Sequence, residues 1–331
     1  MKAFIQAIEF YLPETVLKNN EISAIFPEWP ADKIKNKTGI SVRYIASDDI
    51  CASDLAFKAA EKLFATQVIS REEIDFILLC TQSPDYLLPT SACLLQDRLN
   101  LPKFCGALDF NLGCSGYIYG LGLAKGLIET NQATNILLLT ADTYTKYLDP
   151  TDVSTRTIFS DGASATLISK KKSIQNDNYI SEPLFGTDGS GAKNLILKKG
   201  GTRYYKRQSF ANEFLYMNGS EIFLFIINNI PQLINNTLKK GGLKIEEIDL
   251  FIFHQANQFI LEHLREKIKI PKDKFYISIE NFGNTVSSSI PIALHCAQAE
   301  KKLSSHLKIM LVGFGVGYSW GSVIVHPFLG E

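Results

Sequence analysis

The stretch at 71–85, REEIDFILLCTQSPD, decides the fold, because its pattern returns 174 residues later as IEEIDLFIFHQANQF at 245–259. In each copy a short acidic segment precedes an apolar run of strand type, which ends in polar residues. A second pair of strand-type stretches, starting at Asn135 and Lys308, is 173 residues apart. A third offset, of 170, sets Cys114 opposite Asn284. Three nearly constant offsets indicate a duplicated fold.

Helical stretches alternate with short apolar runs inside each copy, as at 53–67 and 221–242. This alternation predicts an α/β fold with mostly parallel sheets covered by helices. Pro231 predicts a kink or break near Asn229–Ile230, and two glycines at 241–242 are typical of a helix end. The polar stretch 170–183 separates the copies, so we expect an amino-terminal half at 1–175 and a carboxy-terminal half at 176–331.

Composition excludes several classes of protein. The 331 residues include 34 Lys and Arg against 34 Asp and Glu, which does not favour a nucleic-acid partner. The amino terminus lacks a signal-peptide core, and no apolar run reaches the roughly 18 residues that span a membrane. Six cysteines without a CxxC pair argue against structural zinc and disulfide bonds. We therefore expect a cytoplasmic protein.

Cys114 is the first candidate for chemistry, because NLGCSG at 111–116 reads as a junction between a strand and a helix. Free N–H groups and the dipole of a helix start would stabilise a thiolate and lower its pKa. The neighbouring glycines permit close approach of a substrate. A packed core cysteine is the alternative, since free cysteines are often buried.

His254 and Asn284 are the next candidates. His254 begins HQAN directly after a buried strand, where open α/β sheets place their sites, whereas the other four histidines fit packed or solvated positions. Asn284, in NFGNT, could be an ordinary turn residue or cap. Its place opposite Cys114 in the repeat favours a role in the same cleft.

The glycine-rich stretch VGFGVGYSWGSVIV at 312–325 predicts a turn between two strands. It lacks the Lys-Ser or Lys-Thr of a phosphate loop and the helix and acidic residue of a dinucleotide site. Its backbone N–H groups are instead suited to an oxyanion.

Together, GCSG at Cys114, HQAN at His254, NFGNT at Asn284 and GFGVGYSWG at 313–321 resemble the β-ketoacyl-acyl-carrier-protein synthase III family over essentially the whole chain. The resemblance implies the thiolase fold, in which duplicated βα halves form a five-layer α-β-α-β-α sandwich. The duplicated halves agree with the internal repeat. The resemblance also implies a homodimer.

The resemblance further implies a decarboxylative condensation. Cys114 would take an acyl group from a thioester, while His254 and Asn284 would stabilise the enolate formed when malonyl-acyl carrier protein loses carbon dioxide. The backbone N–H groups of Cys114 and Val316 would bind the oxyanion, and Phe314 would shield the malonyl carboxylate from water. Neither a cofactor nor a metal is expected, and acyl carrier protein is the expected partner.

Several substrate-binding positions depart from the family. Counting from KTGI and DPTD puts Lys33 and Val153 where a tryptophan and an arginine would hold the adenine of coenzyme A. A position that shapes the acyl pocket across the dimer falls on Leu88, and two basic positions that dock the carrier protein become Leu224 and Phe259. Docking would then use other basic residues, at Lys33, Lys35 and Lys37, at Arg265, Lys267 and Lys269, or in the loop 198–208.

Other functions stay open at this point. The same cysteine and histidine could transfer an acyl group to an alcohol or amine in specialised metabolism, and chalcone-synthase-like enzymes carry the same three residue types. The order Cys, His, Asn also fits papain-like proteases, although the residues around them do not. A catalytically inactive scaffold is a further alternative. Neither the primer nor its donor follows from the sequence.

Overall fold

Two five-stranded sheets with the same strand order form the frame of the molecule, in a computed structural model that describes residues 2–171, 179–204, 214–304 and 306–326. The order is β1-β7-β6-β4-β5 in the first sheet and β8-β14-β13-β11-β12 in the second. In both, the three strands at one end run parallel and the other two pairings are antiparallel. The expected duplication is therefore visible strand by strand.

The strands have the following bounds. The first sheet consists of β1 (Lys2–Tyr11), β7 (Gly162–Lys171), β6 (Asn135–Asp142), β4 (Phe76–Cys80) and β5 (Gly106–Phe110). The second consists of β8 (Leu184–Thr187), β14 (Ser319–Val325), β13 (Ile309–Gly315), β11 (Leu250–Phe253) and β12 (Phe275–Tyr276). Two small pairs add β2 (Thr15–Lys18) with β3 (Val42–Ile45), and β9 (Leu195–Ile196) with β10 (Tyr216–Met217).

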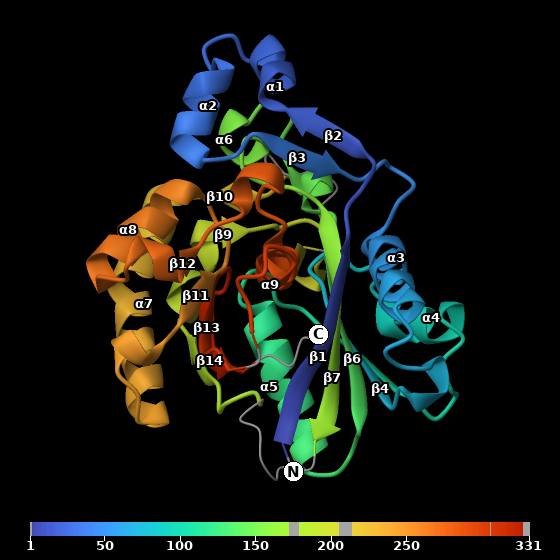
Figure 1. The fold of residues 1–331 in the computed structure, drawn as a ribbon. Coiled ribbons are helices and arrows are strands. Elements are labelled where there is room, and N and C mark those ends of the chain that lie inside the picture. The colour runs from blue at the N-terminus through green and yellow to red at the C-terminus, as the bar shows by residue number, and fades with distance from the viewer. Residues whose placement is uncertain (1, 172–178, 205–213, 305, 327–331) are drawn as a thin grey trace.

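Helices cover the sheets in three layers (Figure 1). The first outer layer is α3 (Ala52–Ala65) with α4 (Ser91–Arg98), and the opposite outer layer is α7 (Gly219–Gly241) with α8 (Gln258–Ile268). Between the sheets lie α5 (Gly116–Glu129) and α9 (Ser289–Ala299), whose apolar residues share one core with both sheets. The five layers are those of the thiolase fold, so the predicted fold class is confirmed.

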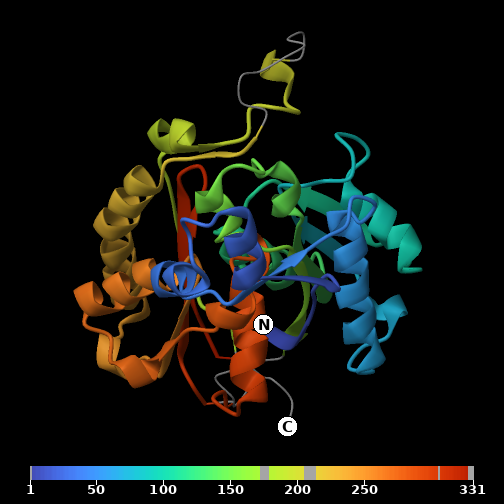
Figure 2. The same ribbon diagram turned by 90° about the horizontal axis from the view of Figure 1, so that it is seen from above.

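Smaller elements close the carboxyl ends of the central strands. One group combines α1 (Asn19–Ile25), α2 (Ala31–Thr38) and the antiparallel β2–β3 pair. Figure 1 shows α6 (Val153–Arg156) beneath this group, and Figure 2 gives the view from above. Short 3₁₀ helices are η1 (Arg71–Glu73), η2 (Tyr144–Tyr147), η3 (Gly189–Asn194), η4 (Thr202–Tyr204), η5 (Ile245–Glu247), η6 (Lys272–Lys274), η7 (Ile279–Asn281) and η8 (Val286–Ser288).

The repeated segments 71–85 and 245–259 also share a hydrogen-bonding pattern. Asp75 precedes β4 and accepts from the backbone N–H groups of Thr134 and Asn135, at 2.6 and 2.9 Å. Asp249 precedes β11 and accepts from the N–H of Lys308 at 2.8 Å. The acidic residue before each central strand therefore fixes the start of the neighbouring strand in both halves.

Helix α7 is continuous through Pro231, so a break near Asn229–Ile230 is wrong, while a kink there stays a prediction. Buried residues on either side of the proline, such as Ile230 and Ile234, hold the helix on the second sheet. The helix does end in glycine, with Gly242 in the left-handed conformation at φ 65°. The division at 175/176 lies outside the described residues. Among the described residues, no helix has both the length and the apolar character needed to cross a membrane.

Candidate active site

Cys114 lies two residues before α5, in the short loop that connects this central helix to β5. Its side chain is buried and belongs to a small apolar cluster with Tyr144, Val286 and Val316. These neighbours come from both halves of the chain. The predicted junction between a strand and a helix is thus confirmed, and it places the sulfur between the two sheets.

Two glycines near the end of β13, Gly313 and Gly315, allow this strand to approach Cys114 closely. A Cβ added at Gly315 would lie 2.8 Å from the Cβ of Cys114 and 3.1 Å from its Sγ. One added at Gly313 would lie 2.9 Å from the Cα of Ser115. The turn predicted at 312–325 is confirmed, and its glycines bring the backbone of one half against the cysteine of the other.

The expected low pKa of Cys114 is wrong in this structure. Burial, and after it the charge of Asp142, raises the pKa of the Cys114 thiol to about 12. The start of α5 favours a thiolate, but the loss of water around the sulfur outweighs that effect. The resting residue is therefore a neutral thiol, whose proton has to leave as the sulfur attacks.

His254 follows β11, as predicted, and its backbone N–H donates to the carbonyl of Val312 at 2.8 Å. The ring is held from the other side by Ser289, the first residue of α9, whose Oγ lies 2.7 Å from Nδ1. Burial lowers the pKa of His254 to about 3, so the imidazole is neutral at physiological pH.

The tautomer of His254 follows from the bonds to Ser289. Ser289 Oγ accepts from the Gln255 N–H at 3.3 Å, and among the described residues Nδ1 of His254 is the acceptor that its hydroxyl hydrogen can reach. The imidazole then carries its own proton on Nε2. His254 is thereby arranged as a neutral hydrogen-bond donor.

Asn284 is held between the halves. Its backbone N–H donates to Ile158 of the first half at 3.0 Å, and its Nδ2 reaches the carbonyl of Ala256, two residues after His254, at 3.4 Å. Its Oδ1 accepts from the N–H of Val286, which packs in the cluster of Cys114. Asn284 is thus tied to the surroundings of both other candidates.

The pairing of Cys114 with Asn284 in the repeat needs a correction. Helices α5 and α9 begin at Gly116 and Ser289, which are 173 residues apart, so Ser287 corresponds to Cys114 and Asn284 lies three residues earlier. The offset of 170 differs because the loops before the two central helices differ in length. The conclusion that Cys114 and Asn284 belong to one region is unaffected.

Phe314 and Val316 lie on the glycine turn, as expected. The ring of Phe314 is buried and packs edge to face on His254, with centroids 5.6 Å apart. Val316 packs against Cys114 and also lines a cavity.

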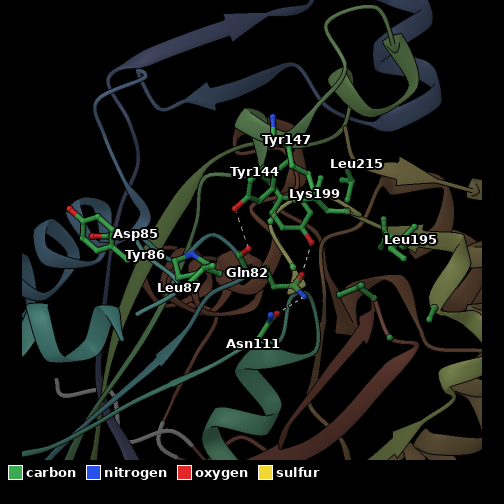
Figure 3. Close-up of a pocket in the computed structure, with 18 residues that line it drawn as sticks. Gln82, Asp85, Tyr86, Leu87, Asn111, Tyr144, Tyr147, Leu195, Lys199 and Leu215 are labelled. Carbon is green, nitrogen blue, oxygen red and sulfur yellow. Dashed lines mark hydrogen bonds between the residues drawn. The ribbon is translucent and has the colours of Figure 1, made fainter. Parts of the chain in front are cut away.

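This cavity, whose lining Figure 3 draws, has a volume of about 630 Å³ and shares Tyr144, Leu215 and Val316 with the cluster of Cys114. Its apolar walls include Leu195 and Leu215. Polar groups lie on the other side, where the Tyr144 hydroxyl donates to Gln82 Oε1 at 2.5 Å and Gln82 Nε2 donates to Asn111 Oδ1 at 3.0 Å (Figure 3). Cys114 itself is not a lining residue, so its link to this space runs through the neighbours that it shares with the lining.

The predicted substrate-binding residues lie at the surface. Leu88 is 82% exposed beside Leu87, which lines the cavity. Lys33 and Lys37 flank the ring of Trp29, with Nζ atoms 4.6 and 5.0 Å from its centroid. Val153 begins α6.

An aromatic ring, that of Trp29, lies beside Lys33 on this face. Arg156 likewise lies on α6, three residues after Val153, and packs over Phe26 at 5.7 Å.

Two of the basic residues named as alternative docking sites already form ion pairs within the chain. Lys35 forms an ion pair with Glu280 at 2.6 Å, and Arg265 forms one with Glu262 at 2.6 Å. Leu224 and Phe259 are about half exposed, at 52% and 54%. Part of the loop 198–208 lies outside the described residues.

Models of known families match the chain in two places. Residues 108–193 match "3-Oxoacyl-[acyl-carrier-protein (ACP)] synthase III", and residues 238–326 match the carboxy-terminal part of the same family. Together these segments contain Cys114, His254, Asn284 and the glycine turn.

Relatives with known names match nearly the whole chain. A Beta-ketoacyl-[acyl-carrier-protein] synthase III 1 of Bacillus cereus is 34% identical, covering 98% of both chains, and a Clostridium perfringens synthase III is 35% identical, covering 95% of this chain and 96% of its own. A crystal structure of a 3-oxoacyl-(acyl-carrier-protein) synthase III is 49% identical, with a TM-score of 0.96 over 98% of this chain and 100% of its own.

Proposed function

Because the chain belongs to the 3-oxoacyl-[acyl-carrier-protein] synthase III family, we propose that Cys114, His254 and Asn284 carry out its condensation of an acyl group with malonyl-acyl carrier protein. The enzyme is an acyltransferase that initiates acyl chains by decarboxylative condensation. The observation that supports the assignment of residues is that both halves supply groups to one small region around Cys114.

The first half-reaction moves the acyl group. The Cys114 sulfur attacks the carbonyl carbon of an acyl thioester, the bond to the donor sulfur breaks, and the thiol proton leaves with the donor as its free thiol. Backbone N–H groups of Cys114 and Val316 would hold the oxygen while it carries negative charge.

The second half-reaction forms the new carbon–carbon bond. Malonyl-acyl carrier protein loses carbon dioxide, and the electron pair of the broken bond forms an enolate at the thioester. The Nε2–H of His254 and the Nδ2–H of Asn284 would stabilise its oxygen. The enolate carbon then attacks the acyl-enzyme, and Cys114 leaves as a thiolate that takes up one proton. Phe314 would keep water from the departing carboxylate.

No step of this proposal uses a cofactor or a metal. Both half-reactions are supported by hydrogen-bond donors and by a sulfur nucleophile that the chain itself carries.

The cavity beside Cys114 would hold the acyl primer. At about 630 Å³ it exceeds what an acetyl group fills, and its Tyr144, Gln82 and Asn111 side would suit a primer with a polar group. Leu88 would complete this space from a second copy of the chain. Coenzyme A or acyl carrier protein, which carries the thioester, would bind on the surface formed by Trp29, Lys33, Lys37 and Val153.

A homodimer is part of the proposal. Strand β5 ends the first sheet and has β4 as its one neighbour in the described part of the chain. An uncovered strand edge is a ready site for pairing with another chain. Exposed apolar residues lie near it, at Leu87, Leu88, Phe104 and Leu108.

We place the enzyme in the cytoplasm, where its six cysteines would stay reduced.

A two-stage mass experiment tests this function. The protein is exposed to acyl-coenzyme A and acyl-carrier-protein thioesters of graded length, and the Cys114 peptide is weighed. Malonyl-acyl carrier protein is then added, and carbon dioxide and 3-oxoacyl product are measured. Cys114→Ser should abolish the adduct, whereas the exposed Cys93→Ser should not. An acylated enzyme that releases its acyl group to an alcohol or amine, and not to malonyl-acyl carrier protein, would overturn the proposal.

A further inference from the structure

Asp142 is a buried carboxyl group to which the condensation assigns no task. It is the last residue of β6 and its side chain has no exposed surface. It accepts from the backbone N–H of Gln82 at 2.8 Å, from the Ser287 hydroxyl, and from the Ser287 N–H at 3.3 Å. Among the described residues, its hydrogen-bond donors are all neutral, so this is a buried acid without a cation bound to it.

The first partner of Asp142 leads to the nucleophile. The side chain of Gln82 bonds Asn111, three residues before Cys114, and takes the Tyr144 hydroxyl. Its Oε1 lies where a Cβ on Gly113, the residue before Cys114, would be only 2.5 Å away. Gln82 therefore forms the wall against which the Cys114 loop rests.

The second partner leads to the other half of the site. Ser287 belongs to η8 and is buried. Its neighbour Val286 donates to Asn284 Oδ1 at 3.0 Å and also packs in the cluster of Cys114. A displacement of Ser287 would therefore move Asn284 relative to the sulfur.

We propose that Asp142 is a positioning residue. Because its carboxyl group accepts hydrogen bonds from Gln82 and Ser287 at once, it holds Asn284 in place relative to Cys114. This inference rests on the proposed function, because it concerns the step in which Asn284 stabilises the enolate. Asp142 touches no reacting atom itself. Its hydrogen bonds join the first half, at Gln82, to the second half, at Ser287, where each half contributes to the site.

The charge of Asp142 supplies a second consequence. Burial raises the pKa of Asp142 to about 7, and the hydrogen bonds from Ser287 and Gln82 oppose that rise. The titratable groups that face it are Cys80 on β4, Cys114, the tyrosines 144 and 147 of η2, and Asp161 before β7. Its negative charge disfavours a thiolate at Cys114. Neutralising Asp142 should then weaken decarboxylation and, at the same time, make Cys114 easier to ionise.

The test uses Asp142→Asn and Ser287→Ala in the full-length enzyme, with Asp75→Asn as the matched control. Asp75 also accepts backbone hydrogen bonds, but at the opposite end of the first sheet. Two rates are measured: carbon dioxide release from malonyl-acyl carrier protein, and alkylation of Cys114 by iodoacetamide at about pH 8. Melting temperatures report whether each variant is folded.

In Asp142→Asn we expect carbon dioxide release to fall about 10- to 100-fold, which is what losing a hydrogen bond to a charged group corresponds to. Alkylation of Cys114 should instead rise, by about threefold or more. A merely structural role would not produce opposite changes. Ser287→Ala keeps the carboxyl group, so its decarboxylation should fall without a rise in alkylation. Asp75→Asn should change neither rate.

The possible outcomes separate this inference from the proposed function. A wild-type enzyme that neither acylates Cys114 nor releases carbon dioxide would overturn the proposed function. A wild-type enzyme that does both, with folded Asp142→Asn and Ser287→Ala decarboxylating at the wild-type rate, would overturn the inference alone. If Asp142→Asn does not fold, unchanged decarboxylation in Ser287→Ala has the same meaning.

Discussion

Replacing Ser289 with alanine removes the hydroxyl group that holds the ring of His254. The hydroxyl oxygen lies 2.7 Å from Nδ1, and both residues are buried. Without this donor, the imidazole can carry its proton on Nδ1, where it has no oxyanion to bind. We therefore expect Ser289→Ala to weaken enolate stabilisation while it leaves the sulfur of Cys114 in place.

The size of the effect follows from the bond that is lost. A buried acceptor without its donor costs about 1–3 kcal/mol. If that cost falls on the transition state for decarboxylation, the rate drops about 5- to 150-fold. Because burial keeps His254 neutral, with its pKa lowered to about 3, this ratio should stay constant between about pH 6 and pH 9.

The assay follows carbon dioxide release from malonyl-acyl carrier protein, and acylation of Cys114 is followed separately by mass. Ser322→Ala is the matched control, because Ser322 is also buried and its hydroxyl also has one side-chain partner, Thr237, on α7. It should cost stability without changing the ratio of the two rates. Wild-type decarboxylation by a folded Ser289→Ala enzyme would refute the assignment of His254 as an Nε2–H donor.

Three further predictions follow from the packing and the charges of the site. Gly315→Ala should abolish acylation of Cys114, because the new methyl group would lie 3.1 Å from Sγ. The control is Gly126→Ala in α5, where the Cβ has open space; it should raise the free energy of unfolding by about 0.5–1 kcal/mol. Tyr144→Phe leaves Gln82 Oε1 without its donor, so the free energy of unfolding should fall by about 1 kcal/mol, and mass measurements should show faster acylation by primers with an apolar end. The raised pKa of Asp142, about 7, means that the folded state binds this proton more tightly than the unfolded chain. Its stabilising contribution is full below about pH 4 and is lost as the pH rises to about 7, so urea unfolding should show a decline of at most about 4 kcal/mol that Asp142→Asn lacks. A decline of equal size in Asp142→Asn would assign it to other groups.

The sequence was sufficient for the fold, because duplication leaves its trace in strand patterns that are local and periodic. The pattern of 71–85 returning at 245–259 corresponds to β4 and β11, the middle strands of the parallel part of each sheet. The positions of Cys114 and His254 directly after strands were also predictable, whereas the chemical roles of Cys114, His254 and Asn284 stay predictions.

Properties that depend on packing could not be predicted. The pKa of Cys114 is raised by burial and by Asp142, which is distant in sequence and has no motif around it. Ser289 and Ser287 are two serines among several in one short stretch, and only the fold shows which partner each one binds. Counting from KTGI to Lys33 likewise cannot show that the ring of Trp29 lies beside that lysine, which only the fold reveals.

The close approach of β13 to Cys114 also bears on the order of events. With Gly315 against one side of the sulfur, that side is closed to any second molecule. In the proposed reaction, the donor thioester and the malonyl thioester would then share the space that remains, one after the other. Sequential entry of the two substrates would follow from this lack of space, because the departing thiol would leave before the chain-extending unit reaches the acylated cysteine.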